Sequence, residues 1–212
     1  MAASATSLPA RLDTAAGPRV NFDCSPGYSV EQLRADVRQQ PRDLAQLHFI
    51  NCDLSTLDFY FLGDYPDLFY LSVDGGSLVQ FNGMPVVSGL RDVRVATTDF
   101  RRWYDASRTP KLNSVHLGRV AGDAVVDQLL DSLSAYNDSL RYLHLERSEL
   151  TRVPSKVNLF GKLSAFHFTA NRRTTALTAG TFPATFTPDV INIQNCGITT
   201  VETGAFEGKP CV

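Results

Sequence analysis

Four histidines are the side chains of this chain best suited to chemistry, and they share one local setting. Each lies between two apolar residues: His48, His116, His144 and His167. An imidazole changes charge at about pH 6.5, and neutral imidazole is a common ligand for zinc. The histidines could therefore form a polar surface, a binding surface that depends on pH, or a zinc or copper site.

The setting of the histidines is part of a longer pattern that recurs seven times from residue 44. The pattern is L-x-x-L-x-L-x-x-N-x-L-x-x-L, with apolar and small substitutions, and its copies start at Leu44, Leu68, Leu90, Leu112, Leu140, Leu163 and Pro188. The alternation at its centre has the period of a β-strand with one buried face. A fixed period predicts a stack of similar units, and such stacks form binding surfaces.

The pattern resembles that of the leucine-rich-repeat superfamily over residues 17–208. Its last unit resembles the extracellular subclass found in animal receptor ectodomains, because Val201 is followed by Glu-Thr-Gly-Ala-Phe206-Glu-Gly, and Phe182 recurs at the same offset. The resemblance implies an α/β solenoid, a right-handed superhelix with a concave parallel β-sheet. Helices and extended segments would lie on its convex side.

The chain divides into four predicted parts. They are a flexible N-terminal segment (1–18), a cap strand and short helix (19–43), the seven repeats (44–208) and a C-terminal end (209–212). Ser29 and Gln32 form an S-x-x-Q capping box, which predicts a helix over residues 30–38. The next strand is due near Val212, which favours a longer repeat array. The second alternative is an uncapped end covered by a partner, as in a dimer.

The apolar pattern also predicts the longest helix and the turn chemistry. An apolar stripe over residues 123–136 predicts a helix on the convex side. The asparagine position of each unit should face inward and bond the backbone of the turn. It holds Cys52, Gly76, Thr98, Val120, Ser148, Asn171 and Cys196. Glycine and valine cannot supply such bonds, so irregular turns are expected.

Three columns of side chains should point away from the core, one strand roughly 4.8 Å from the next. The central column, here named the histidine column, holds His48, Ser72, Arg94, His116, His144, His167 and Asn192. The candidate ligand-binding residues are this column together with Tyr70, Asp92, Tyr142 and Glu146. Tyrosine and arginine are enriched at binding hot spots. Asp92 and Arg94 are expected to form an exposed pair of small energetic value.

The cysteines and one sequon bear on the compartment. Cys24–Cys52 and Cys196–Cys211 are conceivable disulfides, and four reduced thiols are the alternative. Asn137-Asp138-Ser139 is an N-glycosylation sequon, which mildly favours a secreted protein. The N-terminal segment lacks the apolar stretch of a secretory signal. The sequon and the possible disulfides predict an extracellular or cell-surface location. The missing signal stretch leaves a cytoplasmic location as the alternative.

Composition and motifs exclude several function classes. The formal net charge is −2, with 20 basic and 22 acidic residues, which provides no electrostatic case for nucleic acid or an anionic membrane. No apolar run approaches the roughly 18 residues of a membrane span. Phosphate loops and the motifs of nucleophilic or zinc-dependent hydrolases are missing. We therefore expect no enzymatic activity, no cofactor and no membrane contact within this chain.

The expected function is non-catalytic recognition of a protein ligand on the concave face, in a receptor or adhesion ectodomain. An intracellular adaptor or scaffold of the same fold is the alternative. A metal-dependent hydrolase that uses the histidine column is a third candidate, although parallel side chains on adjacent strands converge poorly on a tetrahedral metal.

Overall fold

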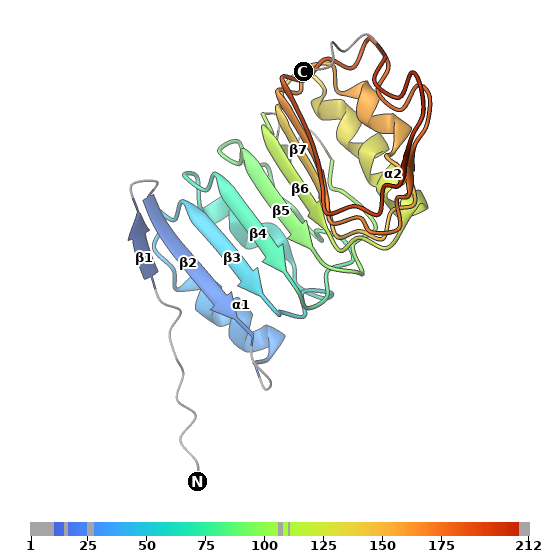
Figure 1. The fold of residues 1–212 in the computed structure, drawn as a ribbon. Helices are drawn as coiled ribbons and strands as arrows, with labels where there is room; N and C mark the ends of the chain where they lie inside the picture. Colours follow the sequence, from blue (N-terminus) through green and yellow to red (C-terminus); the bar gives the residue numbers. More distant parts are fainter. Residues whose placement is uncertain (1–10, 15–16, 25–27, 106–107, 110, 208–212) are drawn as a thin grey trace.

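A computed structural model describes residues 11–14, 17–24, 28–105, 108–109 and 111–207. Within these residues, the main feature is an open nine-stranded sheet in the order β1-β2-β3-β4-β5-β6-β7-β8-β10 (Figure 1). Its strands are β1 (Arg11–Thr14), β2 (Gly17–Asp23), β3 (Gln46–Ile50), β4 (Tyr70–Asp74), β5 (Asp92–Ala96), β6 (Ser114–Gly118), β7 (Tyr142–Glu146), β8 (Ala165–Thr169) and β10 (Val190–Gln194). β1 is antiparallel to β2, and the other neighbours are parallel. The chain therefore has an α/β character with a mostly parallel sheet.

The strands pair in the register that the repeated pattern predicts. The histidine column runs straight across the sheet, since His48 is opposite Ser72, Arg94 is opposite His116, and His144 is opposite His167. β2 continues the column with Asn21, and β10 ends it with Asn192. The predicted strand positions and side-chain columns are thus confirmed. A short second sheet pairs β9 (Ala176–Leu177) with β11 (Thr200–Val201).

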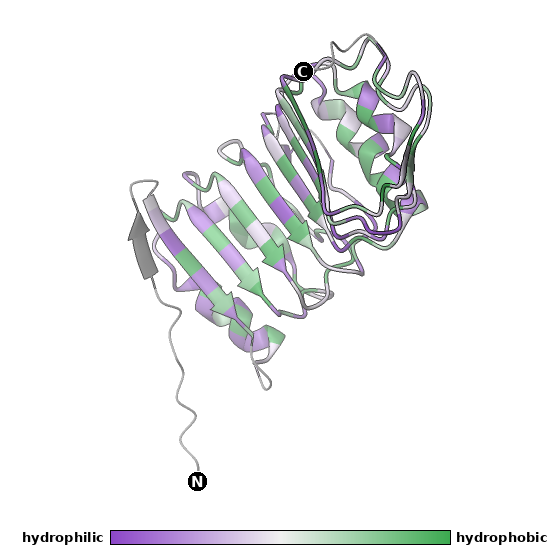
Figure 2. Ribbon diagram, in the orientation of Figure 1, coloured by the Kyte–Doolittle hydropathy of each residue, from purple (hydrophilic) through white to green (hydrophobic). Residues whose placement is uncertain are grey.

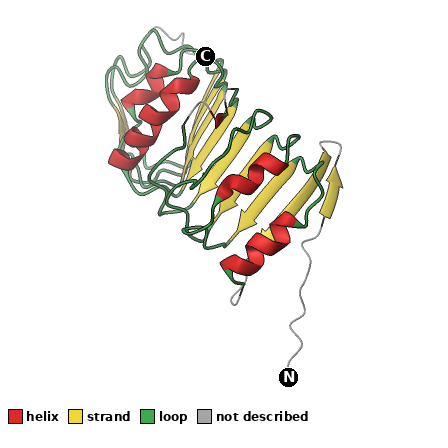
Figure 3. Ribbon diagram, turned by 180° about the vertical axis from the view of Figure 1, so that it is seen from behind, coloured by secondary structure: helices red, strands yellow, loops and turns green. Residues whose placement is uncertain are grey.

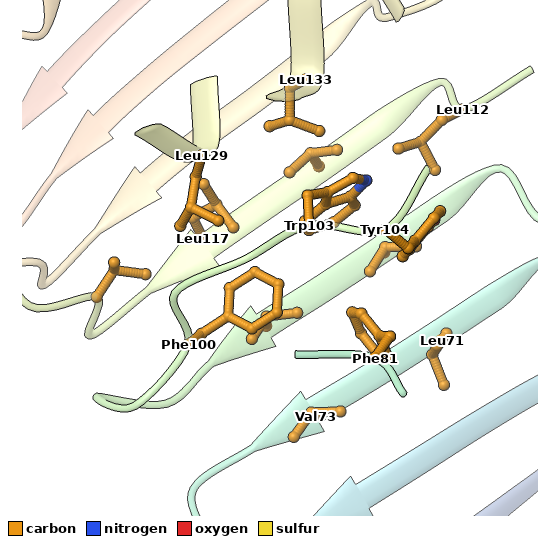
Figure 4. Packing of buried hydrophobic residues seen from close by; sticks show 14 of the residues in the cluster. Leu71, Val73, Phe81, Phe100, Trp103, Tyr104, Leu112, Leu117, Leu129 and Leu133 are labelled. Atoms are coloured by element: carbon orange, nitrogen blue, oxygen red, sulfur yellow. The ribbon is translucent and has the colours of Figure 1, made fainter. Parts of the chain in front are cut away.

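The core lies between the sheet and the return segments, which are the stretches of chain between consecutive strands. Hydrophobic and hydrophilic residues alternate along the strands (Figure 2). Leu71, Val73 and Leu117 of the strands are fully buried, and so are Phe100 and Leu129 of the return segments (Figure 4). Burying one such side chain contributes about 1.5–3 kcal/mol. This continuous core holds the strands in their register.

The helices lie on the core side of the sheet (Figure 3). The predicted helix over residues 30–38 is confirmed as α1 (Val30–Arg38), and Ser29 Oγ accepts the Gln32 N–H at 3.1 Å. The other helices are α2 (Asp123–Leu133) and the 3-10 helices η1 (Phe59–Asp64), η3 (Ser134–Tyr136) and η4 (Ser155–Leu159). α2 is the longest helix among the described residues and occupies the predicted return segment, where Leu129 and Leu133 cover the core.

The inward position of the turns differs from the prediction at one strand. Just after most strands, one residue adopts a positive φ: Asn51, Gly75, Arg119, Arg147, Ala170 and Asn195. Among the described residues that directly follow β3 to β8 and β10, Thr97 alone does not, since a β-branched side chain disfavours that conformation. Thr97 is instead buried and donates to Gly76 O at 3.1 Å, whereas Thr98 is exposed. The prediction that Thr98 faces inward is therefore wrong.

Two of the predicted inward residues, Asn171 and Ser148, link successive turns by hydrogen bonds. Asn171 Oδ1 accepts the backbone N–H of Ser148 at 2.9 Å, and its Nδ2 donates to Leu145 O at 3.0 Å. Ser148 Oγ in turn accepts the backbone N–H of Val120 at 3.1 Å. At the glycine of the column, an added Cβ on Gly76 would lie 2.0 Å from a backbone oxygen. Residues of the following units thus supply the hydrogen bonds that valine and glycine cannot, since Ser148 bonds the backbone of Val120 and Thr97 bonds the backbone of Gly76.

The N-terminal part departs from the predicted flexible segment 1–18. Arg11–Thr14 forms β1, and β2 begins at Gly17. Cys24, just after β2, and Cys52, just after β3, form a disulfide, one of the two pairings that the sequence allowed. Cys196 has a free thiol, and Cys211 and residues 209–212 lie outside the described residues.

Candidate ligand-binding face

The face of the sheet opposite the core, here named the open face, carries the three outward columns. Ten of the eleven predicted candidate residues have side chains that are exposed or half-buried there. Tyr142 is the most exposed aromatic residue on strands β2 to β8, with 42% of its surface accessible. Ser72 is the exception, because its side chain is only 5% exposed. A small serine between larger neighbours is covered by them. Ser72 therefore adds little surface to the open face.

Three histidines of the histidine column form a continuous stack. The ring centroids of His144 and His167 are 4.2 Å apart with planes at 5°, and those of His116 and His144 are 5.3 Å apart at 8°. At the end of the stack, Asn192 Nδ2 lies 3.2 Å from His167 Nδ1. The ordered strands hold the rings parallel, so the stack presents a rigid polar ridge.

Burial and neighbouring charges keep His116 and His144 neutral at neutral pH. Burial, together with the Arg94 guanidinium, lowers the pKa of His116 to about 4, against the opposing effect of Glu146. Burial and the adjacent rings of His167 and His116 lower the pKa of His144 to about 4. Two charged imidazoles at these distances would repel each other. Close stacking therefore favours the neutral forms of His116 and His144.

Arg94 connects the stack to a charged cluster at the ends of β4 to β7. Its Nη1 lies 2.7 Å from His116 Nδ1 and 2.8 Å from Nε2, while Nε2 lies 2.8 Å from Glu146 Oε2. A carboxylate accepts hydrogen bonds, so the neutral ring donates from Nε2 and accepts the Arg94 proton at Nδ1. The neighbouring charges thus select one tautomer of His116.

The predicted pairing of Arg94 with Asp92 is replaced by pairs across the strands. Arg94 lies 3.4 Å from Asp74 and 3.8 Å from Glu146. Asp92 instead accepts a hydrogen bond from Asn113, and burial raises its pKa. Adjacent strands bring side chains closer together than two positions along one strand do. Asp74 on β4 therefore pairs with Arg94 on the adjacent strand β5, whereas Glu146 on β7 pairs with Arg94 past β6 and with Arg147, the next residue.

Three members of the charged cluster were missing from the predicted site. Asp74 bonds Arg119 at 3.3 Å as well as Arg94, and Glu146 bonds Arg147 at 3.2 Å. The sequence did contain a signal for them. Asp74 and Glu146 stand in the same outward column, and the two arginines directly follow strands.

His48 and Tyr70 form a separate aromatic pair near the other end of the column. Their ring centroids are 5.0 Å apart. Burial and, to a smaller extent, the charge of Arg19 lower the pKa of His48 to about 4. The Nε2 atom of His48 is buried and has no hydrogen-bond partner among the described residues. The neutral ring thus acts mainly as an apolar support for the tyrosine.

The described residues contain no group of three or more histidine, cysteine, aspartate or glutamate side chains arranged to hold a metal ion. The three stacked imidazoles are parallel, so their nitrogens do not converge on one point. None of the described helices has the length and apolarity required to cross a bilayer.

Comparison with known proteins assigns neither a family nor a function to the chain. No protein-family model matches the chain, and no curated protein has a matching sequence.

Proposed function

We propose that the chain is a leucine-rich-repeat solenoid, a right-handed superhelix with the open face on its concave side. The support comes from the repeated pattern together with the register of the sheet. Each copy of the pattern supplies one strand of the parallel sheet, and the apolar positions form one buried core. The hydrogen bonds of Ser148 and Asn171 occur at the inward position of this pattern.

On this fold, the proposed function is non-catalytic recognition of a protein ligand on the open face. The observation that supports this function is that contacts between strands hold the side chains of the open face in place. Stacked rings and ion pairs fix the side chains of consecutive strands around Arg94, His144 and the exposed Tyr142. Side chains that are fixed before binding lose little conformational entropy on association. Tyrosine and arginine on such a surface are the residue types that dominate binding energy.

An extracellular or cell-surface location, in a receptor or adhesion ectodomain, is proposed with this function. A disulfide such as Cys24–Cys52 persists in oxidising compartments. Asn137 of the sequon is exposed and follows η3, where a glycan would extend into solvent. An intracellular adaptor of the same fold remains the alternative, and it would carry reduced cysteines and no glycan.

The test is a binding screen of the tagged chain against an array of secreted and cell-surface proteins. Tyr142→Ala should weaken a specific partner at least tenfold. Tyr60→Ala, which removes a 68% exposed tyrosine from η1 on the core side of the sheet, should leave binding unchanged. A partner that is lost with Tyr60→Ala and kept with Tyr142→Ala would place recognition on the helix-bearing side. An array without any specific partner would count against the proposed function.

A further inference from the structure

A shallow groove of about 620 Å³ runs along the edge of the sheet where β4 to β7 begin. Its charged and amide-bearing side chains are Arg91, Asp92, Lys111, Asn113, Asp138 and Arg141. Only Asp92 of these belongs to the predicted site. The groove adjoins the open face, since each of the strands β4 to β7 starts directly beside it.

Two arginines of the groove are held in the same way, two strands apart. Arg91 Nη1 donates to Ser88 O at 2.6 Å and to Leu90 O at 3.0 Å. Arg141 Nη1 donates to the equivalent carbonyls of Asp138 and Leu140 at 3.0 and 3.3 Å. A guanidinium has five donors, so these bonds orient the group and leave donors for a ligand.

The backbone sets the spacing between the two guanidinium groups. The N–H of Asn113 donates to Arg91 O at 2.7 Å, and the N–H of Arg141 donates to Asn113 O at 2.8 Å. The three residues therefore lie side by side on consecutive strands at this edge of the sheet. The backbones of the two arginines are two strand spacings apart, which is about 9.6 Å. Lys111 precedes Asn113, the middle of the three, and is exposed. An extended ligand along the edge would pass three cations in turn.

The charge of the groove favours a ligand with separated acidic groups. Three cations face two carboxylates, so the groove has a net positive charge. The carboxylate of Asp92 is half-buried and bonded to Asn113, whereas Asp138 is exposed. These two carboxylates would repel a uniformly charged polyanion. A peptide with acidic side chains at intervals avoids them and offers backbone amides to them.

An aromatic contact continues the groove onto the open face. Tyr142 directly follows Arg141, and Tyr70 directly follows Phe69, which also lines the groove. Tyr142 is 42% exposed, so its ring is accessible to a ligand that occupies the groove. Paired tyrosine and arginine residues are typical of binding hot spots.

We propose that this groove binds an acidic, extended peptide segment, whose carboxylates contact Arg91, Lys111 and Arg141 and whose apolar side chain packs on Tyr142. The inference rests on the proposed protein-binding function, and it specifies the chemistry of the ligand and the place where it docks. It moves the centre of recognition from the stacked histidines to the starts of the strands.

The test uses two labelled 12-residue peptides that differ only in having glutamate or glutamine at every second position, which places these side chains on one face of an extended peptide. Fluorescence anisotropy with the whole chain should show binding of the glutamate peptide, with at least tenfold weaker binding of the glutamine peptide. Lys111→Glu should weaken the glutamate peptide at least tenfold, because it reverses an exposed cation of the groove. The matched control is Arg38→Glu, which makes the same change of charge on the exposed surface of α1.

Three results would overturn the inference: equal binding of the two peptides, equal effects of Lys111→Glu and Arg38→Glu, or tighter binding of a sulfated oligosaccharide than of the glutamate peptide. A partner from the protein array that is lost with Tyr142→Ala but unaffected by Lys111→Glu would reject the groove and retain the proposed function. Loss of that partner with both variants supports the two together.

Discussion

The imidazole rings of His144 and His167 lie parallel with their centroids 4.2 Å apart, although the two residues belong to different strands. The contact follows from the parallel register, which places each histidine directly beside its counterpart. His116 extends the stack on the other side of His144. His144 is therefore the ring with an imidazole on both faces, and both neighbours contribute to the lowering of its pKa.

Acidification should destabilise the protein through His144. Burial and the flanking imidazoles lower its pKa to about 4, whereas the unfolded chain titrates at about 6.5. The unfolded state thus binds more protons below that pH, and the free energy of unfolding falls as the pH drops from about 6.5 towards 4. From pH 7 to 5, this residue should account for about 1 kcal/mol after allowance for solvent screening.

Urea denaturation of wild type and His144→Gln at pH 7 and pH 5 measures this contribution. The variant should lose less stability than the wild type on acidification, because it has one fewer group to protonate. Identical losses in the two proteins would show that His144 does not couple protonation to folding.

The Cys24–Cys52 disulfide should stabilise the N-terminal part of the sheet. It closes a loop with a sequence separation of 28 residues and joins the chain after β2 to the chain after β3. Replacing both cysteines with alanine should lower the free energy of unfolding by about 2–4 kcal/mol. Reductant should destabilise the wild type to a similar extent and leave the double variant unchanged. An equal effect of reductant on both proteins would contradict this role.

Asn171 should be the most costly polar side chain to remove from the turns. It is fully buried and bonds the N–H of Ser148 and the carbonyl of Leu145. Asn171→Ala leaves both groups buried without a partner, which should cost about 2–3 kcal/mol in chemical denaturation. Gln128→Ala removes an exposed amide from α2 and should change stability by less than about 0.5 kcal/mol. Similar values for the two variants would refute the role given to Asn171.

Asn137 should carry a glycan when the chain passes through the secretory pathway of animal cells. Its side chain is exposed at the end of η3, so an oligosaccharide can be attached without unfolding the helix. Mass spectrometry of the secreted protein should show an added mass that an N-glycosidase removes and that Asn137→Gln lacks. Secreted protein with an unmodified Asn137 would favour the intracellular alternative.

Local sequence alone determined the strands, the columns and the two main helices. A strand with one buried face repeats every two residues, and the units recur at similar intervals, so the sequence alone assigns His48, His116, His144 and His167 to one column. The helix that starts after Ser29 was predictable for the same reason, because a cap and an apolar stripe are encoded within a few residues.

Only the tertiary structure decided which outward side chains meet. Arg94 pairs with Asp74 and Glu146 instead of Asp92, because its long side chain reaches the adjacent strand β4 on one side and, past β6, the strand β7 on the other. Ser72 is covered by larger neighbours, which its position in the column does not reveal.

The same holds for the turn after β5 and for the edge groove. Thr97 takes the inward place predicted for Thr98, since the conformation of one residue after a strand decides which side chain turns in. Arg91 and Arg141 become neighbours along one edge only when the strands between them are stacked. The sequence thus determined the face that a ligand could contact, and the packing of separate strands decided its charges and its groove.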